Sequence, residues 1–208
     1  MIAVDTKQRI LDSAEKLFAN QGLDTSLRTI IADAQVNLAA IHYHYHSKEA
    51  LLDAVLARRL KLINEERIEK LELCGPKATL EGVLEAFIAP AVRVAADPAG
   101  GRNFVRLMGR IVVEDRLPGL IKQHFGAILQ RFTIALQKAV PELPPVELFW
   151  RMHFTAGVMA HTLRAGLDME LISNGVCDPT DVDSVTQRVV AYAAAGFRAP
   201  VPPGANHA

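Results

Sequence analysis

The chain has 208 residues, half of them hydrophobic, so it can form one large domain or two small ones with a sizeable core. Its 23 basic residues equal its 23 acidic residues, and the two signs are also balanced within residues 1–60. Net charge therefore gives no support to nucleic-acid binding, and any attraction to phosphate must come from locally placed side chains.

The two cysteines, Cys74 and Cys177, lie far apart and form neither a disulfide framework nor zinc-ligand spacing, which is typical of a reducing cytoplasm. Residues 1–4 are too short for a signal peptide. No apolar run of the sequence reaches the roughly 20 residues that a membrane span needs. We therefore expect a cytoplasmic protein that does not enter a membrane.

A first helix is predicted to begin after Asp5, because Asp5 and Gln8 have the spacing of a capping box. Gly22 can end this helix, because glycine tolerates the left-handed backbone conformation. The apolar residues recur every three or four positions and share one face: Ile10, Leu11, Ala14, Leu17 and Phe18. This helix is expected to pack across the next two and complete a three-helix domain.

The stretch Ser26–Glu49 predicts two short helices, a tight turn and the start of a third helix. Ser26, Asn37 and Ser47 can each cap one of these helices with a side-chain oxygen. The apolar face of the first short helix consists of Leu27, Ile30, Ile31 and Ala34.

The second short helix, Leu38–His44, has Ile41 as its one large aliphatic residue, so most of its side chains must face solvent or a partner. Such a helix suits DNA recognition, because tyrosine and histidine can donate to phosphate oxygens and small residues allow close approach. Tyr45 is expected to pack beneath the helix. The predicted DNA contacts are Arg28, Asn37, Leu38, Ala39, His42, Tyr43, His44 and Lys48. Plain surface placement remains the alternative for Arg28, His42 and His44.

Several short segments belong to one recognisable pattern. They are Ile10-Leu11-Asp12-Ser13-Ala14, Leu17-Phe18, Gly22, Arg28, Ile41-His42-Tyr43-His44-Tyr45 and Ser47-Lys48-Glu49-Ala50-Leu51-Leu52. Together they resemble the helix-turn-helix of TetR-family transcriptional regulators, over residues 5 to about 60. Two positions depart from that family. Gln35 stands where glycine is usual, so the turn must accept a side chain, and His42 stands where an aromatic residue, often tyrosine, is usual.

The resemblance implies an all-α fold, in which a three-helix N-terminal helix-turn-helix domain is joined by a long helix to a C-terminal helical bundle. It implies a DNA-binding domain at residues 5–60 and a ligand-binding and dimerisation domain at 61–198. Residues 199–208 are rich in proline and small residues and are expected to form a disordered tail. The sequence itself also predicts an all-α protein, because no period-two strand pattern persists in it.

The long helix is predicted over Lys48–Leu71. Its apolar stripe consists of Leu52, Val55, Leu56, Leu60 and Ile63. The charged run at its end is interpreted as a solvated face: Glu65, Glu66, Arg67, Glu69 and Lys70. Further helices are predicted over residues 79–96 with Pro90 inside, 103–115, 118–136, 146–167 and 182–197.

The second region combines flexible methionines, aromatic residues and histidines, which suit a cavity for a mostly apolar ligand. The predicted ligand-binding residues are Phe104, Met108, Phe125, Met152, His153, Met159 and His161. A plain hydrophobic core is the alternative for each of them taken singly. The two histidines, taken as buried, are candidates to bind a carboxylate or carbonyl, and Arg106 and Arg110 are outer candidates for an anionic head group.

The segment Glu147–Phe154 looks similar to the fatty-acid-sensing branch of the family, so a fatty-acid-like effector is one expectation. No cofactor and no metal are expected. His42 and His46 are one helical turn apart, but no carboxylate or cysteine completes a ligand set.

The segments 146–167 and 182–197 carry more apolar surface than one small bundle needs, and they contain small residues that permit close helix packing. We expect these two helices of each subunit to form a four-helix homodimer interface. A two-fold dimer reads two DNA half-sites roughly 34–36 Å apart, whereas one recognition helix reads only a few base pairs.

The leading hypothesis is a ligand-responsive repressor that binds a palindromic operator as a dimer and is released by its effector. An all-α enzyme acting on a lipid-like substrate near His153 and His161 is a second hypothesis. The sequence has no glycine-rich phosphate loop, nucleophile elbow or paired carboxylates that would support it. The third is a small-molecule binding protein without DNA affinity.

Overall fold

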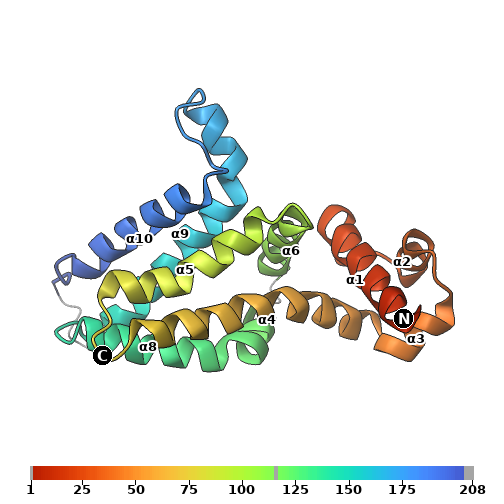
Figure 1. The fold of residues 1–208 in the computed structure, drawn as a ribbon, viewed down its shortest axis with the longest axis horizontal. Helices are drawn as coiled ribbons and strands as arrows, with labels where there is room; N and C mark the ends of the chain where they lie inside the picture. The colour runs from red at the N-terminus through yellow and green to blue at the C-terminus, as the bar shows by residue number, and fades with distance from the viewer. Residues whose placement is uncertain (1, 115–116, 204–208) are drawn as a thin grey trace. The chain divides into compact units, whose positions relative to one another are not determined.

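The computed structural model describes residues 2–114 and 117–203, and those residues contain helices but no strand (Figure 1). The predicted all-α class is therefore confirmed. The helices are α1 (Ile2–Gln21), α2 (Leu27–Ala34), α3 (Leu38–Tyr45), α4 (Lys48–Cys74), α5 (Leu80–Ala96), α6 (Gly101–Val113), α7 (Leu117–Leu120), the π-helical turn η1 (Ile121–Phe125), α8 (Gly126–Ala139), α9 (Pro145–Ile172) and α10 (Val182–Arg198).

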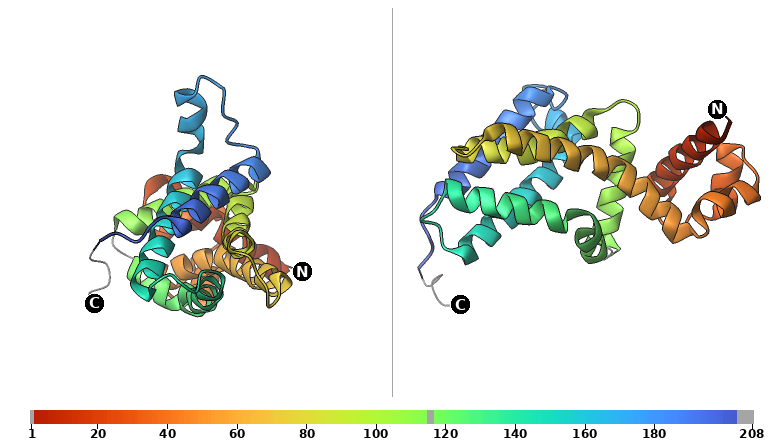
Figure 2. Two further views of the ribbon diagram at one scale, coloured as in Figure 1. Left: turned by 90° about the vertical axis from the view of Figure 1, so that its left-hand side faces the viewer. Right: turned by 60° about the horizontal axis from the view of Figure 1, so that its bottom comes forward.

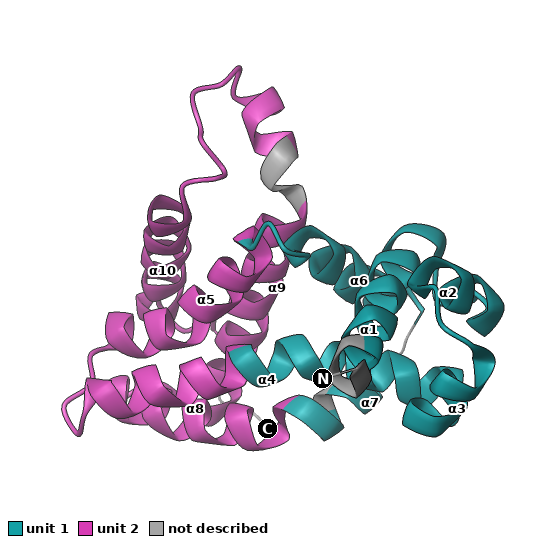
Figure 3. Ribbon diagram, turned by 45° about the vertical axis from the view of Figure 1, so that its right-hand side comes forward, with its two compact units in different colours: residues 1–62, 97–124 teal, residues 63–96, 125–208 magenta. Residues whose placement is uncertain are grey.

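The chain forms two compact units, which Figure 3 shows in different colours. Unit 1 consists of Met1–Leu62 and Asp97–His124, and unit 2 consists of Ile63–Ala96 and Phe125–Ala208. The units are not consecutive along the chain, because the segment 97–124 joins the amino-terminal helices. Helix α4 is continuous through the boundary at residue 62. The functional boundaries predicted from the sequence, 5–60 and 61–198, stay a prediction.

The amino-terminal helices of unit 1 close around the predicted apolar face of α1. Ile10, Ala14 and Phe18 are fully buried there, as are Ile30 of α2 and Ile41 of α3. Helix α1 ends as predicted, because the residue after Gln21 is a glycine with φ of +108°. Its predicted start is wrong: the backbone is helical from Ile2, which places Asp5 inside the helix instead of at its cap.

Helix α6 also packs against α1 within unit 1. Its buried face carries Phe104, Leu107 and Ile111. From its other positions, Arg110 donates to the Ala19 carbonyl at 2.9 Å. Because the last carbonyls of a helix lack intrahelical partners and carry partial negative charge, this arginine stabilises the end of α1.

A buried charge cluster connects α1, α4 and the loop before α6. The Arg59 guanidinium pairs with Glu15 at 3.1 Å and with Asp97 at 2.8 Å, and it donates to the Ala99 carbonyl. Burial by itself lowers the pKa of Arg59, but the two carboxylates outweigh it and raise that pKa above its ordinary value. Gly100 has φ of +117°, and a Cβ there would collide with the Arg59 guanidinium, so glycine is required beside the cluster.

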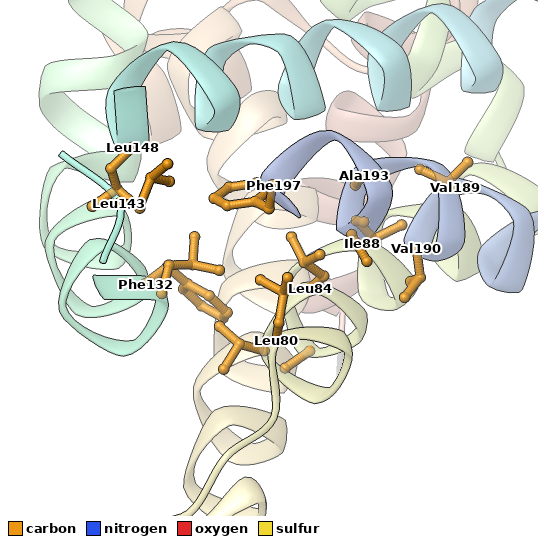
Figure 4. Close-up of a cluster of buried hydrophobic side chains, with 14 of the residues drawn as sticks. Leu80, Leu84, Ile88, Phe132, Leu143, Leu148, Val189, Val190, Ala193 and Phe197 are labelled. Atoms are coloured by element: carbon orange, nitrogen blue, oxygen red, sulfur yellow. The ribbon is translucent and has the colours of Figure 1, made fainter. Parts of the chain in front are cut away.

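The core of unit 2 is formed by helices α5, α8, α9 and α10 (Figure 4). Leu84 and Ile88 of α5 meet Phe132 of α8 and Phe197 of α10 in this core. Pro90 lies inside α5, as the sequence predicted. The ring of Phe87, at the edge of the core, contacts Phe132 in an edge-to-face arrangement with centroids 5.1 Å apart.

A second buried ion pair in unit 2 holds α10 against α9. Arg151 pairs with Glu147, one turn earlier on α9, at 3.0 Å. The same guanidinium donates to the carbonyls of Gly196, Phe197 and Ala199 at the end of α10. A buried cation therefore satisfies the last carbonyls of α10 while its own charge is neutralised by Glu147.

Several predicted helix ends differ from the structure. Helix α9 continues to Ile172 instead of ending near 167, and in Figures 1 and 2 its last turns and the loop to α10 stand away from the other helices of unit 2. The predicted helix 118–136 is divided into α7 and α8 by η1, because five residues take a wider helical turn. Helix α6 starts at Gly101, two residues early, since Gly100 provides the turn before it. Residues 199–202 are not helical, and residues 204–208 of the predicted tail lie outside the described residues.

Candidate nucleic-acid interface and effector region

The three predicted helix caps in the helix-turn-helix region are confirmed. The Ser26 hydroxyl accepts from the Thr29 N–H at 3.2 Å, and the Asn37 side-chain oxygen accepts from the Ala40 N–H at 2.9 Å. The Ser47 hydroxyl accepts from the Ala50 N–H at 3.0 Å. Each cap satisfies a free donor at a helix start, so α2, α3 and α4 begin at positions that the sequence fixes locally.

The turn between α2 and α3 accepts a side chain at Gln35, as predicted. This residue has φ of 53° and ψ of 46°, a left-handed conformation that glycine adopts more readily. Arg9 of α1 donates to the carbonyls of Ala34 and Gln35 at 2.6 and 2.9 Å. The turn is therefore held from outside by an arginine, which the sequence pattern did not single out.

Helix α3 has one buried side and one exposed side. Ile41 and Tyr45 are buried, and burial raises the pKa of the Tyr45 phenol. Tyr43 is 79% exposed, and Leu38 is 53% exposed. Ala39 and His42 are exposed with them. Large apolar and aromatic groups therefore point outward from a short capped helix whose underside is fixed in the core, which is the arrangement a recognition helix requires.

The flanking residues offer positive charge beside this surface. Arg28, in the first turn of α2, is exposed and makes no ion pair within the described residues. Lys48 is half-buried in the first turn of α4, and His44 is half-buried with its ring 4.9 Å from that of Tyr43. Asn37 is exposed, and its amide nitrogen is not used by the cap. The part of α2, α3 and α4 that presents Arg28, Leu38, Tyr43 and Lys48 is called the α3 surface below.

Comparison with known proteins assigns both parts of the chain to one family. Residues 10–55 match the family model described as bacterial regulatory proteins, tetR family. Residues 85–196, more than half of the chain, match the model described as tetracyclin repressor-like, C-terminal domain. The chain belongs to the TetR family. This TetR-family protein is a DNA-binding transcriptional regulator and not an enzyme.

Individual relatives of this TetR regulator are similar over about a quarter of its length. The HTH-type transcriptional regulator TtgW of Pseudomonas putida is 41% identical over 58 residues, which are 27% of this chain and 43% of that protein. The HTH-type nicotine-responsive transcriptional repressor HdnoR of Paenarthrobacter nicotinovorans is 36% identical over 59 residues, 28% of this chain and 30% of that protein. Each match thus spans less than half the length of the relative.

A solved structure shows that the fold extends over nearly the whole TetR chain. The fatty acid degradation regulator FadR from Bacillus halodurans superposes with a TM-score of 0.63, at 14% sequence identity. The superposition covers 89% of this chain and 94% of that one. The helix-turn-helix domain, the long helix and the C-terminal helical domain predicted from the sequence are therefore the family's architecture.

The predicted effector residues of the TetR chain fall into both compact units. Phe104 and Met108 lie in unit 1, where Phe104 belongs to the buried face of α6. Phe125, Met152 and Met159 are half-buried in unit 2. His153 and His161 are exposed, so the expectation that they are buried is wrong for the single chain: both lie on the outer side of α9. Their binding of a ligand stays a prediction.

The two outer arginines are engaged within unit 1. Arg106 donates to the Asn20 side chain at 2.9 Å, and Arg110 donates to the Ala19 and Asn20 carbonyls. They therefore stabilise the end of α1, where the sequence had suggested partners for an anionic head group.

Arg67 is a residue that the sequence interpretation placed wrongly. It was assigned to a solvated charged face, but it is 2% exposed. The signal was present in the spacing, because Arg67 follows Leu60 and Ile63 by seven and four positions and continues their stripe.

A second unpredicted feature is a surface hollow of about 540 Å³ between α5 and α10. Its lining residues are Glu81, Glu85, Thr186, Gln187, Val190, Ala191, Ala194, Ala195 and Arg198.

Unit 2 also exposes a group of aromatic side chains on α9 and α10. Phe149, Trp150 and Phe154 are exposed on α9, and Tyr192 is exposed on α10. The rings of Trp150 and Phe154 stack with centroids 5.7 Å apart. These four residues are called the α9–α10 aromatic face below.

Within the described residues, no helix is long and apolar enough to cross a membrane, and no three metal-ligating side chains come together.

Proposed function

We propose that the protein is a ligand-responsive repressor, acting in the cytoplasm, that binds a palindromic DNA operator as a homodimer and leaves it when a small, mostly apolar effector binds. The observation that carries the proposal is the α3 surface: an outward-facing tyrosine and leucine on a capped helix, beside the exposed Arg28. Base edges are reached by such a helix in the major groove, while the flanking cations contact phosphates. The predicted DNA contacts all lie on or beside this surface.

The dimer is proposed to form through α9 and α10, in the segments 146–167 and 182–197. The α9–α10 aromatic face supports it, because exposed aromatic residues, two of which stack on each other here, are typical of surfaces that associate. A two-fold partner places a second α3 surface on the same duplex, and two half-sites one turn apart then specify the operator.

Release is proposed to follow from the preference of the effector for one dimer state. A ligand shifts an equilibrium only by its differential affinity for the two states. The effector therefore binds the state in which the two α3 surfaces no longer match successive major grooves. Helix α4 runs through both compact units and is the natural connection between effector and DNA.

The names of the relatives support the repressor and effector parts of the proposal. HdnoR is named a nicotine-responsive repressor, and FadR is named a regulator of fatty acid degradation. A fatty-acid-like effector for this chain is proposed on the second name together with the segment Glu147–Phe154.

Operator binding is tested by selecting binding sequences from random duplex DNA and measuring affinity by gel shift. We expect a two-fold symmetric site and an affinity that declines steeply with salt, because phosphate contacts release counterions. The variants Y43A and K48A should each weaken binding strongly while the dimer persists in sedimentation experiments. K138A is the matched control, because it removes an exposed lysine from α8 of unit 2. Retained affinity in Y43A and K48A, or an equal loss in K138A, contradicts the assignment.

A further inference from the structure

Arg67 occupies a position in α4 that the helix otherwise fills with apolar residues. Leu60 and Ile63 precede it on the same stripe, and all three side chains are at most 3% exposed. An arginine at such a position must remove a permanent charge from water, which is costly unless a partner compensates it.

The contacts of Arg67 are all with neutral groups. Its Nε donates to the Phe87 carbonyl at 2.8 Å, and its Nη1 donates to the Asn64 side-chain oxygen at 3.3 Å. The guanidinium carbon lies 4.0 Å from the centre of the Phe87 ring. Nη2 takes part in neither hydrogen bond. Burial lowers the pKa of Arg67 to about 10, so the group still carries its charge at neutral pH.

The other deeply buried arginines of the described chain differ from Arg67 in one respect. Arg59 has the carboxylates of Glu15 and Asp97, and Arg151 has that of Glu147. Among the described residues, no carboxylate forms an ion pair with Arg67. Arg67 of unit 2 is thus a buried cation that no carboxylate of the described residues compensates, and such groups are more frequent at binding sites than elsewhere.

The surroundings of Arg67 suit the apolar part of a ligand. Phe87 covers the guanidinium and meets Phe132 edge-on, and Phe132 is fully buried in the core of unit 2. Pro90, one turn after Phe87 in α5, has no N–H, so it cannot donate to the Ala86 carbonyl, next to the Phe87 carbonyl that Arg67 contacts. A helix weakened at a proline can move more easily than a regular one.

We propose, on the basis of the function proposed above, that Arg67 binds the carboxylate of an amphipathic effector whose apolar part lies against Phe87 and Phe132. The planar guanidinium matches two carboxylate oxygens, and Nη2 together with Nη1 provides the donors. The carboxylate takes the place of the Asn64 side chain and supplies a negative charge that the described residues do not place beside Arg67. The effector is thus a monoanion with an apolar tail.

The proposal is tested by calorimetric titration of the full chain with two matched series of probes. The first series is the saturated fatty acids from octanoate to dodecanoate, and the second is the primary alcohols with the same tails. We expect the protein to bind at least one acid about tenfold or more tighter than its alcohol, because a buried charge-assisted contact is lost in the alcohol. In R67M the acid should bind about tenfold or more weaker, whereas affinity for the alcohol should change by less than about twofold.

Two further variants separate binding from structure. R93M is the matched control, since Arg93 is a more exposed arginine of unit 2 that pairs with Glu66, and it should keep the preference for the acid. R67Q keeps hydrogen-bonding capacity without charge and decides the question if R67M does not fold. Equal or undetectable binding of acids and alcohols by the unaltered chain overturns the proposal, as does an equal loss of preference in R93M and R67M.

The same preparations distinguish this inference from the repressor function. Without any probe, the unaltered chain and R67M should bind the selected operator alike in a gel shift, because Arg67 lies in unit 2, away from the α3 surface in sequence. Absence of operator binding refutes the repressor, while the acid-to-alcohol preference is still measured in the titration and decides the role of Arg67 independently.

Discussion

The two compact units differ in whether a buried arginine has a carboxylate partner and in whether aromatic side chains are exposed. In unit 1 the buried arginine Arg59 is matched by Glu15 and Asp97. The inward-facing apolar residues of α1, α2 and α3, among them Ile10, Ile30 and Ile41, are enclosed. In unit 2 Arg67 is buried, no carboxylate of the described residues pairs with it, and the α9–α10 aromatic face is exposed. Unit 1 therefore compensates its buried arginine with its own carboxylates, whereas unit 2 carries an exposed aromatic face and a buried charge that call for further partners.

Replacing Arg59 or Arg67 by methionine tests this difference most directly, because it should affect stability very differently in the two units. R59M removes the cation that Glu15 and Asp97 share, while Arg58 still pairs with Glu15 at 2.6 Å. Because Glu15 keeps one partner, we expect a loss of about 2 kcal/mol of unfolding free energy. R67M removes a buried charge without stranding an opposite one, so its unfolding free energy should change by less than about 1 kcal/mol. Urea unfolding followed by circular dichroism measures both.

The exposed Asp12 provides the control for the charge cluster. Its carboxylate pairs with Arg58 at 2.6 Å but is 59% exposed, so D12N should cost less than about 0.5 kcal/mol. If R67M destabilises the protein as much as R59M does, Arg67 has a mainly structural role and the contrast between the units fails.

The second prediction concerns the α9–α10 aromatic face. W150E places a carboxylate between Phe149 and Phe154, and burying an unpaired charge in a dimer interface should raise the dissociation constant at least about a hundredfold. Sedimentation velocity over a range of concentrations measures the change. L73E is the control, because Leu73 is exposed at the end of α4, outside the aromatic face. A dimer that persists in W150E places the interface elsewhere.

Local signals in the sequence predicted unit 1 well. Ser26, Asn37 and Ser47 cap their helices as expected, since a cap depends on residues within one turn of each other. Gly22 ends α1 for the same reason. The burial of Ile41 and Tyr45 beneath α3 followed from spacing alone, and so the outward side of that helix was predictable.

Non-local features were not predictable in the same way. Arg67 was interpreted together with its charged neighbours Glu65 and Glu66 as a solvated face. Its burial involves contact with Phe87 of α5, which is 20 residues away in the sequence. The exposure of His153 and His161 depends on which side of α9 faces the core of unit 2. Neither residue type nor spacing decides this when a helix is apolar on several sides. The predicted DNA and effector contacts remain predictions that the variants above test.

A smaller effect is expected at the turn of the helix-turn-helix. Gln35 has a left-handed backbone, which strains a residue with a side chain and costs glycine little. Q35G should therefore raise the unfolding free energy by about 0.5–1 kcal/mol, since relief of strain exceeds the entropy that glycine loses on folding. Q21G, at the last residue of α1 with its side chain exposed, is the control and should lower stability. Thermal unfolding distinguishes the two signs.

The smallest expected effect is the pH dependence of the stability that Asp97 contributes to the charge cluster of unit 1. The Ala99 N–H and then the Arg59 guanidinium hold the pKa of Asp97 below its ordinary value. A carboxyl whose pKa is lowered by folding stabilises the protein above its ordinary pKa of about 3.9 and loses that contribution as pH falls through the lower folded value. The stability advantage of the unaltered chain over D97N should therefore shrink between about pH 5 and pH 2, by about 0.5 kcal/mol because Asp97 is partly screened by solvent. D183N, at an exposed carboxylate in the first turn of α10, is the control outside the charge cluster, and an equal change there would mean that the cluster does not respond to acid as a unit.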